Sequence, residues 1–160
     1  MFGALRLLHR RILAIARRLA WLPPFVAHAS VGLVFVGTGW GKLQHLDHVI
    51  EFFRSLGIPA PELQAPFVAG TELTCGTLLV LGLGTRFAAV PLICTLLVAI
   101  RTAIWQQLDD ALDLFGREEY LLITLLVWLA IAGGGPISLD ALVTRRLEGD
   151  GVPRHELLRP

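Results

Sequence analysis

The segment from Ala65 to Trp105 most constrains what this chain can fold into, because it holds two long apolar stretches separated by a short turn sequence. The turn sequence, Gly-Leu-Gly-Thr-Arg at 82–86, predicts a tight connection, so the two stretches should form a helical hairpin. Glu72 lies well inside the first stretch. A carboxylate inside a long apolar segment is costly to bury, which makes Glu72 a candidate functional residue.

The composition indicates that the hairpin belongs to a membrane protein. Of the 160 residues, 54% are hydrophobic and 17% are charged, and the mean hydropathy is +0.65. Soluble domains average about 45–50% apolar and about 25% charged residues. The net charge of +1 gives no indication of a nucleic-acid partner.

The predicted fold class is all-α: an integral membrane four-helix bundle with an N-terminal amphipathic surface helix. Each predicted span approaches the 20 or so residues that cross a bilayer, although the uncharged part of the third, Phe87–Ile100, is short. A short amphipathic helix is predicted at 45–56, and Ser138 is a predicted helix N-cap. The segments are 1–22, the surface helix; 23–143, the four-span domain with spans at about 24–43, 65–84, 86–105 and 119–137; and 144–160, a polar tail.

The N-terminal segment 1–22 combines an apolar helical face with several arginines. A basic amphipathic helix of this kind suits an anionic membrane surface, and a solvated helix that packs on a partner is the alternative. Pro23 and Pro24 should end it. The apolar face and the arginines are formed by Leu5, Leu8, Ile12, Ile15, Leu19 and Leu22, and by Arg6, Arg10, Arg11, Arg17 and Arg18.

The distribution of basic residues predicts the orientation in the bilayer. With four spans, both termini lie on one side together with ten of the fourteen Lys and Arg residues. The positive-inside rule therefore places both termini in the cytoplasm. The predicted location is the bacterial cytoplasmic (inner) membrane, as a multi-pass protein.

Four charged side chains, one from each span, are predicted to lie at a similar depth near the outer surface. At a rise of about 1.5 Å per residue, Glu72 is roughly 20 Å and Arg101 roughly 24 Å from the turn at Thr85. Lys42 ends the first span and Glu119 begins the fourth on the same side. Either these groups form an outward-open polar pocket, with Glu72 and Lys42 as its catalytic residues and Arg101 and Glu119 lining it, or they fix helix register and reach to the interface.

The sequence contains no recognisable metal or haem motif. Cys75 and Cys94 lie at similar depth, but helix rotation decides whether they face each other. Membrane-buried cysteines usually serve as small apolar side chains. His28 has no second histidine at matching depth on another span, so a hydrogen-bonded role is favoured over haem ligation.

A set of short motifs recurs in order along residues 26–142: Gly32, Phe35, Gly39, Lys42 and Leu43, the loop Gly57-Ile58-Pro59-Ala60-Pro61, Glu72-Leu73 and Gly76, Leu81-Gly82-Leu83 with the turn residues Thr85 and Arg86, Glu119, and Gly133, Gly135, Pro136 and Ser138-Leu139-Asp140. With these motifs the chain resembles the DoxX family of small four-span bacterial membrane proteins. Cys75 stands where the family often has glycine, and Arg101 is not part of the family pattern.

The resemblance implies a membrane subunit linked to quinone-dependent or thiol-related oxidation. The leading hypothesis is a redox-associated subunit, within a quinone-linked oxidoreductase, whose outer pocket takes a quinone or small acceptor. The alternative is a non-catalytic scaffold that docks a soluble oxidase or maturation enzyme. The expected partners are the lipid bilayer, a protein of a membrane redox complex and further copies of the chain.

Overall fold

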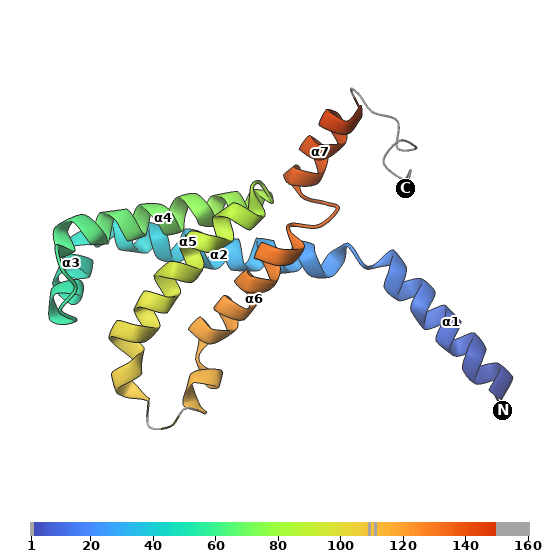
Figure 1. Cartoon of the computed structure of the whole chain (residues 1–160), viewed down its shortest axis with the longest axis horizontal. Helices are drawn as coiled ribbons and strands as arrows, with labels where there is room; N and C mark the ends of the chain where they lie inside the picture. Colours follow the sequence, from blue (N-terminus) through green and yellow to red (C-terminus); the bar gives the residue numbers. More distant parts are fainter. Residues whose placement is uncertain (1, 109, 111, 150–160) are drawn as a thin grey trace, which may run out of the picture.

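The computed structural model describes residues 2–108, 110 and 112–149, and these form helices joined by short connections (Figure 1). The described residues contain no strand, which confirms the all-α prediction for this membrane protein. The helices are α1 (Phe2–Arg18), α2 (Leu22–Gln44), α3 (Leu46–Ser55), α4 (Pro61–Leu81), α5 (Thr85–Ala99), α6 (Glu118–Ala132) and α7 (Leu139–Gly149). A π-helical turn, Ile100–Ile104, extends α5, and two 3₁₀ turns, Trp105–Gln107 and Asp113–Gly116, lie before α6.

Helices α2 and α4 form the most extensive helix–helix contact in the described chain and run side by side in Figure 1. Glycines make the contact possible. A Cβ placed on Gly32 would lie 2.6 Å from the Val80 amide nitrogen, and one on Gly39 would lie 2.5 Å from that of Leu73. Gly76 of α4 is equally crowded, since its Cβ would lie 2.8 Å from the Val36 nitrogen. The two backbones therefore touch directly, as small residues allow in membrane helices.

The second pair, α5 and α6, packs against the first near the turn that joins α4 to α5. The shared core includes Phe35 of α2, Leu79 of α4, Leu92 of α5 and Leu126 of α6, all of them buried. Figure 1 shows that the opposite ends of α5 and α6, joined by 100–117, lie well away from α2 and α4. The two pairs are thus closely packed at one end and separated at the other.

The lengths of the helices differ in detail from the predicted spans. Among the described residues, two helical runs are long and apolar enough to cross a membrane, α2 and residues 85–104. Helix α6 ends at Ala132, before the predicted limit of 137, because Gly133 adopts a φ of 79°. A positive φ combined with the extended ψ of −176° cannot continue a helix and is adopted almost only by glycine.

Helix α3 confirms the short amphipathic helix predicted at 45–56 and lies against the start of α4. Arg54 donates hydrogen bonds to Glu51 of its own helix and, at 2.6 Å, to Glu62 in the first turn of α4. The Glu62 backbone amide and the Arg54 guanidinium hold the pKa of the Glu62 carboxyl below its usual value.

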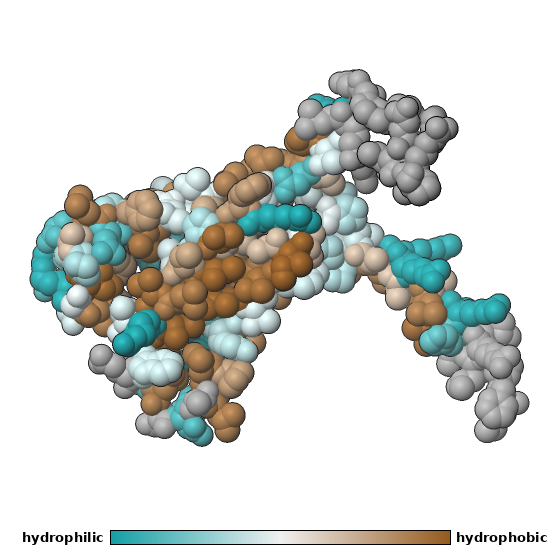
Figure 2. Space-filling view, viewed as in Figure 1, coloured by the Kyte–Doolittle hydropathy of each residue, from teal (hydrophilic) through white to brown (hydrophobic). Residues whose placement is uncertain are grey.

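Helices α1 and α7 both leave the molecule from the end that carries the α4–α5 turn, and they point in different directions (Figure 1). Helix α1 ends at Arg18, before the predicted limit of 22, and Pro23 and Pro24 lie in the first turn of α2 rather than between the two helices. Arginines and the large apolar side chains Ile12, Leu13 and Ile15 are exposed on α1. Figure 2 shows both kinds of surface along this helix.

Candidate functional site

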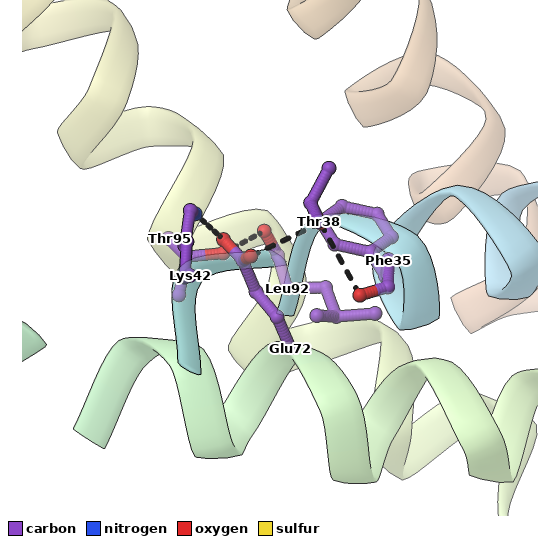
Figure 3. Close-up of polar contacts among 6 residues, drawn as sticks. All are labelled: Phe35, Thr38, Lys42, Glu72, Leu92 and Thr95. Atoms are coloured by element: carbon purple, nitrogen blue, oxygen red, sulfur yellow. Dashed lines mark hydrogen bonds and ion pairs between the residues drawn. The ribbon is translucent and has the colours of Figure 1, made fainter. Parts of the chain in front are cut away.

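Glu72 on α4 accepts hydrogen bonds from two side chains of α2 (Figure 3). The Lys42 ammonium forms an ion pair with its Oε1, and the Thr38 hydroxyl donates to Oε2 over 3.1 Å. Glu72 is only 5% exposed, whereas the Lys42 side chain is 31% exposed. The pair therefore has a buried anion and a cation that still reaches the surface.

The helical repeat and the glycine contact together explain why these groups meet. Thr38 and Lys42 are four residues apart and so lie on one face of α2. Between them, Gly39 packs against the backbone of Ala69 and Leu73, on either side of Glu72. This close approach places the carboxylate within reach of both donors.

The arrangement can bind a polar group and exchange a proton with it. In a poorly solvated environment a carboxylate and an ammonium interact more strongly than they do in water. A ligand that displaces Lys42 from Glu72 would expose one proton acceptor and one cation to its own polar atoms. This is a minimal acid–base site.

Arg101 and Glu119 lie apart from this pair. Arg101 is exposed in the π-helical turn after α5, and Glu119 is half-buried in the first turn of α6. Within the described residues, neither makes an ion pair or hydrogen bond with Lys42 or Glu72. The structure thus brings together two of the four predicted pocket residues and adds Thr38. The four-residue spacing between Thr38 and Lys42 was the available signal for that third group.

His28 is hydrogen-bonded, as the sequence analysis favoured. It is 1% exposed, and its Nδ1 lies 2.8 Å from the Leu79 carbonyl oxygen, so Nδ1 carries the proton that this oxygen accepts. Its Nε2 has no hydrogen-bond partner in the described part of the chain. No group of three or more His, Cys, Asp or Glu residues among the described positions is arranged to hold a metal.

Cys75 and Cys94 line a common groove between α4 and α5, with a volume of about 600 Å³. Both are free thiols, with Cys75 half-buried and Cys94 exposed. Thr71, Thr74 and Thr95 also line this groove. Thr95 donates its hydroxyl to the Leu92 carbonyl at 2.9 Å, so that group is occupied within α5 (Figure 3).

The turn residues Thr85 and Arg86 begin α5, where a side chain from α7 caps the helix. Asp140 accepts hydrogen bonds from the Gly84 amide at Oδ1, over 2.6 Å, and from the Thr85 amide at Oδ2, over 3.0 Å. Its own amide donates to the Gly82 carbonyl at 3.0 Å. Ser138 caps α7 as predicted, since its Oγ accepts the Ala141 amide at 3.2 Å.

Replacing Asp140 with asparagine is expected to lower the free energy of unfolding by about 1–2 kcal/mol, the usual cost of losing a helix cap. Asparagine supplies one acceptor oxygen where two amides are now satisfied, and it carries no charge at the N-terminus of α5. The loss should be measured by thermal unfolding in detergent. Asp47→Asn, which removes an exposed carboxylate in the first turn of α3, is the control; equal losses in the two variants would contradict the capping role.

Comparisons with known proteins place these features in a family. The DoxX family model matches residues 24–105. The chain is 33% identical over 121 residues to "Putative oxidoreductase CatD" of Bacillus subtilis, covering 76% of this chain and 87% of CatD. The chain belongs to the DoxX family. No solved structure shows a significant match to this DoxX protein.

Two further relatives are described as membrane proteins. The "Uncharacterized membrane protein Rv3486" of Mycobacterium tuberculosis is 33% identical over 133 residues, which cover 76% of this DoxX chain and 82% of the relative. The "Inner membrane protein YphA" of Escherichia coli is 33% identical over 121 residues, which cover 72% and 86% of the two chains. This DoxX chain is accordingly a protein of the lipid bilayer.

Proposed function

We propose that this DoxX protein is a redox-associated membrane subunit in which Glu72 and Lys42 bind the head group of a quinone or a similar small acceptor. The observation that carries the proposal is the buried Glu72 carboxylate, held by Lys42 and Thr38 between α2 and α4. The name of the Bacillus relative, "Putative oxidoreductase CatD", agrees with a redox role.

In this proposal the chain crosses the bacterial inner membrane several times, with both termini in the cytoplasm. Ten of the fourteen Lys and Arg residues lie on the side that carries both termini, and this excess supports the orientation. Lys42 and Glu72 then lie toward the outer surface, at the end of the α2–α4 pair where α3 begins.

The two charged groups have complementary roles in the proposed reaction. Reduction of a quinone to a quinol adds two electrons and two protons, and a partner oxidoreductase would supply the electrons. The Lys42 ammonium stabilises the negative charge that develops on the quinone oxygen. Glu72 is the proton acceptor: for each electron that arrives it takes up one proton from water at the outer surface and passes it to a quinone oxygen, while the Thr38 hydroxyl keeps the carboxylate oriented.

Glu72→Gln is expected to weaken the binding of a short-chain quinone to the purified protein by at least about tenfold, because the ionised acceptor is lost. Equilibrium binding in detergent, followed by protein fluorescence, measures the change. Glu51→Gln removes an exposed carboxylate on α3 and is the matched control. Unchanged affinity in Glu72→Gln would rule out the proposed site.

A non-catalytic scaffold is the second candidate, and the exposed basic helix α1 favours it. The described part of α1 presents arginines and apolar side chains with no large contact to the other helices. Affinity purification of the full chain from native membranes, with and without residues 1–18, tests for a stoichiometric protein partner. Recovery of the same proteins by both chains would contradict docking through α1.

A further inference from the structure

A second cavity lies at the opposite end of the α2–α4 pair from Glu72, where α5 begins, α6 ends and α7 starts. Its volume is about 540 Å³, within the usual range for ligand pockets. Its lining includes Arg86 and Phe87 of α5, the glycine run 133–135 after α6, and Asp140 and Thr144 of α7. The proposed redox site uses none of these residues.

Arg86 supplies a cation to this cavity, and no carboxylate of the described residues forms an ion pair with it. The position of a Cβ on Gly133 would lie 3.3 Å from Nε and 3.8 Å from one terminal nitrogen of Arg86, so the guanidinium lies against the backbone of Gly133. Within the described residues, Arg86 forms no ion pair. A guanidinium presents a planar set of donors that matches the oxygens of phosphate.

Backbone amides line the same cavity, and an unpartnered hydroxyl lies against the backbone of Gly134. Gly134 and Gly135 line the cavity, and in the described chain their amides donate to no backbone or side-chain acceptor. A Cβ on Gly134 would lie 2.8 Å from the Thr85 hydroxyl oxygen, which is completely buried and has no hydrogen-bond partner in the described chain. Consecutive amides of this kind, in a turn with positive φ, commonly bind anions.

The Asp140 carboxylate lines the same cavity, but its charge is already compensated. Both of its oxygens accept amides at the N-terminus of α5, where the helix dipole favours an anion. Among the described residues at the cavity, the donors that remain without acceptors are therefore Arg86, the glycine amides and the Thr85 hydroxyl behind them.

The position of the cavity points to the head group of a lipid. Arg86 lies in the first turn of α5, at the end of a helical run long and apolar enough to cross the bilayer. The next residue, Phe87, also lines the cavity and is 85% exposed. A ligand held by Arg86 would thus have its polar part at the membrane surface and its apolar part along α5.

We propose that the cavity formed by Arg86 and the Gly133–Gly135 turn binds the phosphate group of an anionic phospholipid. The phosphate oxygens accept hydrogen bonds from the guanidinium and from the glycine amides, and the acyl chains lie against Phe87. Free phosphate shares the same recognition chemistry, so the test must separate the two sources.

The test measures binding of fluorescent phosphatidylglycerol to the full chain in a neutral detergent. Arg86→Gln is expected to weaken binding at least about tenfold, and Arg86→Lys less, because lysine keeps the charge but loses the forked donors. Diacylglycerol of the same chain length, which lacks phosphate, should bind wild type as weakly as phosphatidylglycerol binds Arg86→Gln. Competition by millimolar inorganic phosphate would assign the site to a free anion, and its absence would assign it to lipid.

Arg101→Gln is the matched control, because it removes an exposed arginine from the other end of the same helical run. It should leave phosphatidylglycerol binding unchanged, because Arg101 does not line the cavity. The arginines of α1 are present in every variant and so cannot account for a difference between variants. Three results would each overturn the proposal. The first is equal affinity of wild type and Arg86→Gln for phosphatidylglycerol, and the second is an equal loss of affinity in Arg86→Gln and Arg101→Gln. The third is binding of diacylglycerol to wild type that equals that of phosphatidylglycerol. Thermal unfolding of each variant, measured in parallel, establishes that a loss of binding occurs in folded protein.

Discussion

Replacing Gly39 with leucine is expected to force α2 and α4 apart and to lower the free energy of unfolding by about 3 kcal/mol. A Cβ at this position would lie 2.5 Å from the Leu73 nitrogen and 2.9 Å from the Ala69 carbonyl oxygen. Both obstacles are backbone atoms, so no side-chain rotation can relieve the overlap. The separation would also move Lys42 away from Glu72, because Gly39 lies between Thr38 and Lys42 on α2.

Gly37→Leu is the control for this prediction. Gly37 is in the same helix, and a Cβ there would meet no atom within 4 Å. Both variants carry the same intrinsic change in helix propensity, so the difference between their unfolding temperatures in detergent isolates the helix–helix contact. Similar temperatures for Gly37→Leu and Gly39→Leu would show that α2 and α4 do not touch at this point.

Replacing Lys42 with methionine is expected to lower the free energy of unfolding by about 3 kcal/mol, because it leaves the buried Glu72 carboxylate without its cation. Methionine has a similar length and apolar stem, so little packing is lost. Thr38 would remain as a single neutral donor to the carboxylate.

A double variant separates the penalty for an unpaired charge from other effects of the substitution. Lys42→Met combined with Glu72→Leu removes both charges and should recover most of the lost stability, since an apolar pair can replace a buried ion pair at little cost. Chemical or thermal unfolding of the two single variants and the double variant provides the coupling energy. Additive losses would mean that the two side chains do not interact in the folded protein.

Depth counting from the sequence was sufficient to predict that Lys42 and Glu72 lie at the same level. It could not predict their direct contact, because that depends on how α2 and α4 rotate about their axes. The rotation is set by Gly32, Gly39 and Gly76, which bring one particular face of each helix into contact. Thr38 joins the pair for the same reason.

The same counting could not locate Arg101 and Glu119 relative to the pair. Equal depth places side chains in one layer only if the helices remain parallel, whereas α5 and α6 diverge from α2 and α4 at this end (Figure 1). The divergence follows from tertiary packing that is concentrated around Leu79, Leu92 and Leu126.

The turn and the start of α7 were predicted separately, as a hairpin connection and as a capped helix. Their contact through Asp140 joins residues far apart in the sequence. No local pattern encodes such a contact. Asp140 lies two residues after the Ser138 cap, in the first turn of α7, where a carboxylate also stabilises its own helix. The sequence alone therefore offered no reason to expect that Asp140 caps α5.

The direct backbone contact between α2 and α4 has a consequence for the order of assembly during synthesis. In lipid the hydrophobic effect does not drive two apolar helices together, so their association depends on close van der Waals contact. That contact involves glycines of α2 and α4 themselves, and both helices are synthesised before α5 and α6. The first helix pair can therefore associate while the remainder of the chain is still at the ribosome, and later helices dock onto a preformed partner.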